Sequence, residues 1–380
     1  MTPSIHRAKF VLATRVSLLL VIMLLANCAD PSPTVTVTET TTATTTMTMT
    51  PLPTSTMTAT ATVASTATST STPTVTATPT QTPTATVTPT PTPHPMEPYT
   101  IDRLRERDYP GGTIQIKWTY TTTNAYTRYY VTYPSDDLTI SGVLCVPHGQ
   151  GPFPIIILNH GYISPSEYWS GADTWYASDY LAQQGYLTLS PDFRGWGESD
   201  SGEDYFRTGL VFDALNLISS LASLSKADPD RVGMWGHSMG SGVTTKAIVL
   251  DDRIDAAVLY GPVPADDRLY FNRWRPGRNP NALTDPLEIA YQRALSDRRF
   301  LQRISPITYF SLVTAPVQIH VGESDDVTPP RWAKAIRDEL IEQGKAVEYY
   351  QYPGQGHAFH DDSWTLFMER VTQFFDQYLK

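Results

Sequence analysis

The chain has 380 residues and a formal net charge of −10 at pH 7. This acidic balance argues against nucleic acid as a partner, because binding to phosphates requires clustered Lys and Arg. The two cysteines, Cys28 and Cys145, predict no disulfide framework, and the sequence contains no zinc-ligand spacing. We therefore expect neither a metal nor another cofactor.

Residues 1–28 have the organisation of an export signal. Three basic residues precede an apolar run over 16–26, which is too short to span a bilayer comfortably but suits the core of a signal peptide. The run ends in Leu25-Ala26-Asn27-Cys28, which resembles the lipobox of bacterial lipoproteins, although Asn27 departs from the usual small residue. That resemblance implies a lipid on Cys28, membrane attachment through the N-terminus and a location at the cell surface. Ordinary signal cleavage and an uncleaved anchor are the alternatives.

Residues 29–95 consist almost entirely of Thr, Pro, Ala, Ser and Val. Such a segment has too little large apolar surface to offset the entropy of ordering, so we expect a disordered or extended linker. Pro-rich segments extend by about 3 Å per residue, and their hydroxyls are common sites of O-linked sugars. The remaining residues, 96–380, are long enough for one α/β domain with a large core.

The first part of this domain predicts antiparallel strands, and the rest predicts alternating strands and helices. Residues 112–120, 126–133 and 138–146 alternate or are rich in β-branched and aromatic side chains. Short apolar runs follow, and they indicate strands covered on both faces. These runs span 153–158, 186–189, 232–235, 256–259, 317–321 and 347–350, and helical patterns span 175–184, 211–224, 243–250, 332–342 and 364–378. The alternation predicts a mostly parallel sheet with helices on both faces.

The strongest chemical motif is the pentapeptide Gly236-His237-Ser238-Met239-Gly240. A turn at 228–230 and a strand over 231–235 precede it, and a helix follows. A sharp turn between strand and helix strains the serine and projects its hydroxyl, and glycines permit the close approach of the backbone. We predict Ser238 as a nucleophile, whereas a simple helix-capping serine is the alternative.

A serine nucleophile needs a general base, and the base needs an acid to orient it. The segment after the strand at 316–320 contains Asp325 and Asp326, of which we favour Asp325 as the acid because it stands at the carboxyl end of a buried strand. The Gly-rich loop after the next strand contains His357, which we favour as the base over His360.

The developing negative charge needs backbone N–H donors. We predict the amides of Met239, directly after the nucleophile, and of Tyr162, in the turn His160-Gly161-Tyr162. We interpret His160 and His237 as structural residues.

With these motifs the chain resembles the catalytic domain of the prolyl oligopeptidase family and its dienelactone-hydrolase-like and esterase relatives. The likeness runs from about 138 to 380 and implies the α/β-hydrolase fold with the triad Ser238, Asp325 and His357. The motifs that carry it are the His160-Gly161 turn, Asp192-Phe193-Arg194-Gly195-Trp196-Gly197-Glu198-Ser199, the segment 228–240, Ser305-Pro306, the segment 322–329 and Gly356-His357-Ala358-Phe359.

The resemblance does not fix the substrate. Prolyl oligopeptidases proper carry a propeller that screens substrates by size, and the chain has no room for one. Xylan and cephalosporin acetyl esterases carry a Gln after the nucleophile and an Arg-Gly-Gln, which Met239 and Arg194-Gly195-Trp196 do not match. We therefore expect a small ester substrate first and a short peptide second, and a binding protein without turnover is the third hypothesis.

Residues 262–304 leave the alternation of strand and helix and predict a lid-like insertion. The segment 268–274 is aromatic and basic. Its rings either line a pocket for the substrate or pack inside the domain, and Trp169, Trp175 and Trp196 have the same two interpretations.

Overall fold

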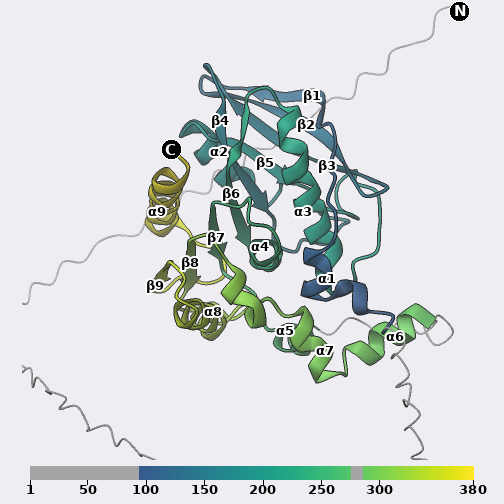
Figure 1. Ribbon diagram of the computed structural model, residues 1–380. Coiled ribbons are helices and arrows are strands. Elements are labelled where there is room, and N and C mark those ends of the chain that lie inside the picture. The colour runs from purple at the N-terminus through teal and green to yellow at the C-terminus, as the bar shows by residue number, and fades with distance from the viewer. Residues whose placement is uncertain (1–93, 275–285) are drawn as a thin grey trace, which may run out of the picture. The chain divides into compact units, whose positions relative to one another are not determined.

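A computed structural model describes residues 94–274 and 286–380 (Figure 1). These residues belong to a unit that spans Thr86–Lys380. The predicted export signal and nearly all of the predicted linker lie outside the described residues.

The described residues form a nine-stranded sheet with the strand order β1-β2-β3-β5-β4-β6-β7-β8-β9. The strands are β1 (Gln115–Thr122), β2 (Tyr126–Ser135), β3 (Leu138–Pro147), β4 (Phe153–Asn159), β5 (Leu187–Pro191), β6 (Ala227–His237), β7 (Ala256–Tyr260), β8 (Val317–Gly322) and β9 (Val347–Tyr352). The pairs among β1, β2, β3 and β5 are antiparallel, and all pairs from β5 through β4 to β9 are parallel. The predicted sheet, antiparallel at its start and then mostly parallel, is confirmed.

Two apolar cores lie on the two faces of the sheet. In β4, Ile155 and Ile157 belong to one core, and Ile156 and Leu158 belong to the other. Successive side chains of a strand point to opposite faces, so a continuous apolar run is what a strand covered on both faces requires. The run at 153–158 was predicted to be such a strand, and this is correct.

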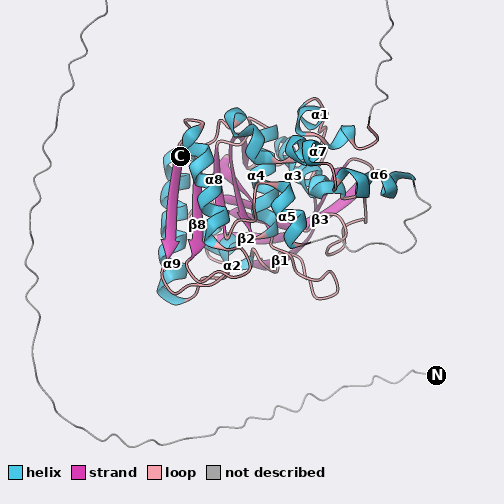
Figure 2. Ribbon diagram, turned by 90° about the horizontal axis from the view of Figure 1, so that it is seen from below, coloured by secondary structure: helices cyan, strands magenta, loops and turns pink. Residues whose placement is uncertain are grey.

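Helices cover both faces of the sheet, as Figures 1 and 2 show. On one face lie α2 (Trp175–Gln183) and α9 (Asp361–Leu379), and on the other lie α3 (Thr208–Ser220), α4 (Met239–Leu250) and α8 (Pro330–Glu342). This arrangement is the α/β-hydrolase architecture that the motifs implied.

Some element boundaries differ from the sequence-based expectations. The predicted turn at 228–230 lies within β6, because Ala227 already pairs with Phe153 of β4. The alternating segment at 112–120 forms β1 only from Gln115, and all eight residues of this strand are exposed. As the edge of the sheet, β1 has a neighbour on one side only, so alternation there does not indicate burial.

The described part of the insertion between β7 and β8 contains the short α-helices α5 (Asp267–Arg273), α6 (Pro286–Ala294) and α7 (Arg298–Ile304), on either side of residues that the structure does not describe. Its apolar side chains pack with Met96 and Phe206 in a separate core. The first described segment, with η1 (Glu97–Tyr99) and α1 (Ile101–Arg105), therefore helps to hold the insertion.

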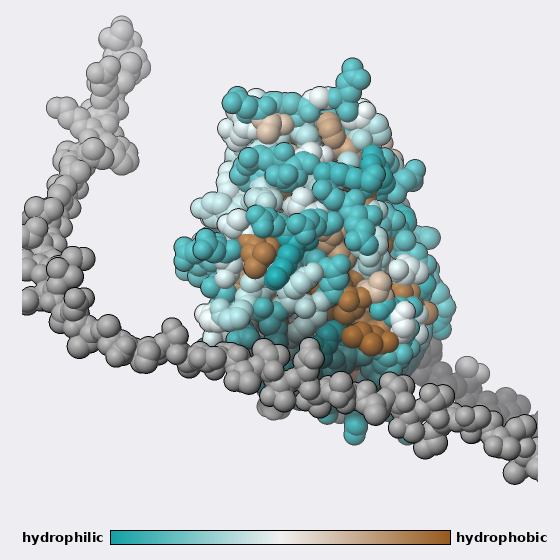
Figure 3. All heavy atoms as spheres, turned by 90° about the vertical axis from the view of Figure 1, so that its left-hand side faces the viewer, coloured by the Kyte–Doolittle hydropathy of each residue, from teal (hydrophilic) through white to brown (hydrophobic). Residues whose placement is uncertain are grey.

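The surface on the α9 side of the sheet is mostly hydrophilic, with a few separate apolar patches (Figure 3). Within residues 94–274 and 286–380, no helix combines the length and the apolar character that crossing a bilayer demands.

Candidate active site

Ser238 lies between β6 and α4 in a strained conformation. Its φ of 51° and ψ of −116° place it in a region that non-glycine residues rarely occupy. Its amide donates a hydrogen bond of 2.9 Å to the Tyr260 carbonyl on β7, and its carbonyl accepts one of 3.0 Å from Ser241 in α4. Strand and helix together hold the serine in this turn, as the pentapeptide predicted.

The two glycines of the pentapeptide leave no room for a side chain. A Cβ on Gly236 would lie 2.3 Å from the Gly240 carbonyl oxygen, and a Cβ on Gly240 would lie 2.0 Å from that of Asn159. Real Cβ contacts are essentially never this short, so Gly236 lets α4 pack closely on the end of β6, and Gly240 lets α4 pack against the end of β4. This packing brings the loop after β4 next to Ser238.

Asp325 follows β8 and is buried. Its Oδ1 accepts hydrogen bonds from the amides of Val327, at 3.0 Å, and Thr328, at 2.7 Å, and its Oδ2 accepts one of 2.7 Å from the Thr328 hydroxyl. Burial alone would raise the pKa of Asp325, but hydrogen bonds from His357 and Thr328 outweigh it and lower the pKa. The carboxyl group is therefore held ionised as an acceptor.

His357 lies beside Asp325 in the loop between β9 and α9. Its Nδ1 is 2.8 Å from Asp325 Oδ2 and 3.0 Å from the Thr328 hydroxyl, and its side chain is 20% exposed. Gly261 lies against the ring, because a Cβ there would be 3.2 Å from His357 Cε1. The structure thus brings together the favoured acid and the favoured histidine. Nε2 of His357 lies on the side of the ring away from the Nδ1 that contacts Asp325.

The competing residues are not joined to this pair. His360 is exposed at the start of α9, where its amide bonds to Gln355. Among the described residues, Asp326 bonds through its carbonyl, which accepts a hydrogen bond of 3.4 Å from Arg273.

The loop after β4 reaches the serine through Gly161. A Cβ on this glycine would lie 3.3 Å from Ser238 Cβ, so the backbone passes directly beside the nucleophile. Tyr162 follows, with its side chain 66% exposed and packed edge-on against Trp196. Within the part of the chain that the structure describes, the amides of Tyr162 and Met239 donate no hydrogen bond. Their role as oxyanion donors stays a prediction.

Thr328, Asp173 and His237 also bond to residues of the site. No sequence pattern pointed to Thr328 or Asp173. Thr328 bonds to both Asp325 and His357, and Asp173 bonds to His237 and to the Gly161 amide. His237 was interpreted as structural from the sequence, although its position directly before the nucleophile could have indicated a role in the site. His160 is buried and bonds to the Asp192 carbonyl and to its own loop, which fits a structural role.

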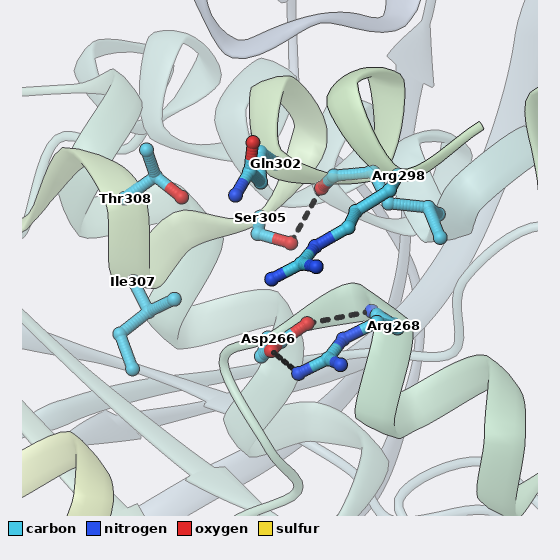
Figure 4. Close-up of a pocket in the computed structure, with 8 residues that line it drawn as sticks. Asp266, Arg268, Arg298, Gln302, Ser305, Ile307 and Thr308 are labelled. Atoms are coloured by element: carbon cyan, nitrogen blue, oxygen red, sulfur yellow. Dashed lines mark hydrogen bonds and ion pairs between the residues drawn. The ribbon is translucent and has the colours of Figure 1, made fainter.

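Two hollows lie near the site and in the insertion. A pocket of about 460 Å³ lies beside His237, and its walls include Tyr176, Trp364 and Phe359. A smaller hollow of about 190 Å³ lies in the insertion, where Arg298 and Arg268 extend into it from α7 and α5 (Figure 4). None of the predicted site residues lines the smaller hollow, and its Arg268 already pairs with Asp266 at 3.2 Å.

The aromatic residues of the insertion take part in packing. Phe271 is buried against Phe206, Tyr270 lies under the Arg207 guanidinium, and Trp274 packs against Trp332. These contacts favour the packing interpretation for the segment 268–274 over the pocket interpretation. Whether the insertion acts as a lid stays a prediction.

Solved structures share this fold. An acetyl xylan esterase from a Thermoanaerobacterium species superposes with a TM-score of 0.55 at 18% identity, covering 76% of this chain and 95% of that one. A puromycin-hydrolysing peptidase from Mycobacterium tuberculosis superposes with a TM-score of 0.54 at 20% identity, covering 68% of this chain and 41% of that one. At these identities the likeness defines the fold alone, which is the α/β-hydrolase fold.

The sequence comparison narrows this assignment. The model of the prolyl oligopeptidase family matches residues 173–380, more than half of the chain. The chain therefore belongs to the prolyl oligopeptidase family and is a serine hydrolase. An uncharacterised 31.7 kDa protein of Escherichia coli is 24% identical over 284 residues, which cover 62% of this chain and 94% of the relative.

Proposed function

We propose that this protein is an exported carboxylic ester hydrolase that forms an acyl-enzyme on Ser238. His357 acts as the general base and Asp325 orients it. The observations that carry the proposal are the hydrogen bond of 2.8 Å between His357 Nδ1 and Asp325 Oδ2 and the strained turn at Ser238. The amides of Tyr162 and Met239 form the oxyanion hole.

The proposed reaction has two halves. The Ser238 oxygen attacks the ester carbonyl carbon while its proton passes to His357 Nε2. The carbonyl oxygen becomes negative and accepts hydrogen bonds from the two amides, each of which lowers the barrier by about 3 kcal/mol. The alcohol then leaves with the proton from His357. A water molecule next gives a proton to His357, attacks the acyl carbon and releases the carboxylic acid, and Ser238 regains its proton.

An ester is the favoured substrate because the chain covers more of its esterase neighbour than of its peptidase neighbour. The match covers 95% of the acetyl xylan esterase but only 41% of the puromycin-hydrolysing peptidase, so more than half of that peptidase lies outside the match. A serine peptidase for short peptides is the second candidate, and membership of a family named for oligopeptidases favours it. A non-catalytic binding protein is the third, and a complete set of Ser238, Asp325 and His357 argues against it.

Substrate comparison tests the proposed chemistry. With the purified protein we expect p-nitrophenyl esters of short acyl chains to be turned over with a kcat/KM at least about tenfold above that of peptidyl-coumarin amides, a difference of about 1.4 kcal/mol in transition-state binding. We also expect covalent labelling by a fluorophosphonate probe. The reverse preference would favour the peptidase, and a protein that neither labels nor turns over any of these substrates would favour the binding protein.

Export and a lipid on Cys28 are a separate part of the proposal. They are supported by the basic start, the apolar run and the lipobox-like end of residues 1–28. In a bacterial host that expresses the full chain, we expect the protein in the membrane fraction and Cys28→Ser in the soluble or secreted fraction. Equal membrane association of both forms would contradict the lipid anchor.

A further inference from the structure

An aspartate–histidine pair that the proposed reaction does not use lies beside the nucleophile. His237 Nδ1 is 2.9 Å from Asp173 Oδ2 and 3.0 Å from its Oδ1. The same Oδ2 accepts a hydrogen bond of 2.6 Å from the Gly161 amide, and His237 Nε2 lies 3.3 Å from the His357 carbonyl oxygen. The His237 ring also stacks on Tyr260, with 4.3 Å between the ring centres.

Each of these contacts lies next to a residue of the proposed machinery. Gly161 precedes Tyr162, whose amide is one oxyanion donor, and His237 precedes Ser238. The third contact is to the backbone of His357 itself. These residues come from loops after β4, β6 and β9, and the side chains of Asp173 and His237 join all three.

We infer that Asp173 and His237 are positioning residues, which tie the oxyanion loop and the loop of the general base to the nucleophile. This inference rests on the proposed function, because it assigns the pair a role in the geometry of that reaction. Misplacement of reacting groups by about 1 Å costs on the order of 100-fold in rate, so such a pair has a measurable effect on kcat without touching substrate.

The two contacts of His237 require its charged form. A carboxylate and a carbonyl only accept hydrogen bonds, whereas a neutral imidazole carries one N–H and an imidazolium carries two. Burial would lower the pKa of His237, but the charge and hydrogen bond of Asp173 outweigh it, and the net effect is a raised pKa. In the same way burial would raise the pKa of Asp173, but the charge of His237 outweighs it and lowers that pKa.

Groups on several elements face His237. Asp173 precedes α2, Tyr260 ends β7, Asp325 follows β8 and His357 follows β9. The adjoining pocket adds three more titratable groups, Tyr176, His360 and Asp361. Of these, Asp173 alone forms a hydrogen bond through a carboxylate with the imidazole, so its removal is the direct test of the charged form.

The sign of the pH effect follows from the raised pKa. Below the ordinary histidine value of about 6.5 the imidazolium holds both contacts in full. As the pH rises through the raised value in the folded protein, one N–H is lost and one of the two contacts breaks. We therefore expect kcat to fall along an alkaline limb that His237 controls.

Variants of both residues test the inference. His237→Phe keeps a flat ring on Tyr260 but removes both hydrogen bonds, and Asp173→Ala removes the acceptor of His237 and Gly161. For each we expect kcat for a p-nitrophenyl ester to fall about 10- to 100-fold with little change in KM. Asp173→Asn can still accept from Gly161 and can donate to a neutral His237, whose other nitrogen then donates to His357. We expect it to be at least about tenfold more active than Asp173→Ala and to lack the alkaline limb.

A matched control uses another buried histidine of the sheet. His320 in β8 bonds to Tyr352 at 2.8 Å and to Gln318 at 2.7 Å, outside the site. We expect His320→Phe to lower Tm but to keep kcat within about twofold of the wild type.

The outcomes separate this inference from the proposed function. If His237→Phe and Asp173→Ala keep wild-type kcat while Ser238→Ala is inactive, the positioning role is wrong and the proposed reaction stands. If Ser238→Ala is active, the proposed reaction itself fails. If Asp173→Ala and His237→Phe do not fold, the inference is tested by comparing the pH profiles of kcat for the wild type and Asp173→Asn. Identical alkaline limbs in the two profiles would contradict the inference.

Discussion

Replacing Ser238 with alanine is expected to lower kcat for a p-nitrophenyl ester by about 10⁴-fold or more. The variant has no hydroxyl to attack the carbonyl carbon, so the acyl-enzyme cannot form. Only binding and the oxyanion donors remain, and these give a small residual rate. Steady-state kinetics and fluorophosphonate labelling both measure this loss, and labelling is expected to disappear.

Two further variants sharpen this result. Ser223→Ala is the matched control, because Ser223 bonds to Ser220 and Ile114 in a turn after α3, away from the site. We expect it to label like the wild type. The double variant Ser238→Ala, His357→Ala should be no slower than Ser238→Ala alone, because residues that act as a unit do not contribute additively. Labelling that survives in Ser238→Ala would overturn the assignment of the nucleophile.

Exchange of Asp325 for asparagine is expected to lower kcat by about 10³- to 10⁴-fold. The carboxylate accepts a hydrogen bond from His357 Nδ1, which leaves Nε2 unprotonated and able to take the proton of Ser238. An amide at this position donates a hydrogen bond to Nδ1 and favours the tautomer with the proton on Nε2. The histidine is then held in place in the wrong form.

The neighbouring carboxylate provides the control for this variant. Within the described part of the chain, the Asp326 side chain does not bond to Ser238, His357 or Asp325, and its backbone carbonyl, which bonds to Arg273, is unchanged by substitution. We expect Asp326→Asn to retain kcat within about twofold, as surface substitutions usually do. If Asp326→Asn is the inactive variant and Asp325→Asn is active, the assignment of the acid is wrong.

The Asp325→Asn variant is also expected to change how the stability of the protein depends on pH. Because folding lowers the pKa of Asp325, its stabilising contribution is complete above the unfolded value of about 3.9 and is lost as the pH falls through the lower folded value. The Tm of the wild type should therefore fall more steeply than that of Asp325→Asn as the pH falls below about 4. Parallel Tm curves would show that the carboxylate contributes nothing to acid stability.

Much of the fold and site followed from local sequence patterns. The continuous apolar runs predicted strands covered on both faces, because such strands need no alternation. The pentapeptide around Ser238 predicted the strained turn, since only glycine fits on either side of it. The choices of Asp325 over Asp326 and of His357 over His360 rested on position at the ends of strands, and the structure joins the favoured residues at 2.8 Å.

Other features depended on contacts between distant residues. The exposure of β1 follows from its place at the edge of the sheet, and the packing of Phe271 against Phe206 follows from how the insertion folds back onto the domain. A local pattern of hydropathy predicts neither feature.

Local sequence patterns were enough to predict the serine, its turn and the strand ends that carry an acid and a histidine, because these depend on short-range backbone geometry. The contacts of His237, in contrast, became visible only in the folded structure. Its partners Asp173 and His357 lie 64 and 120 residues away along the chain. No spacing rule connects side chains at such separations, and they meet only because the carboxyl ends of parallel strands share one edge of the sheet.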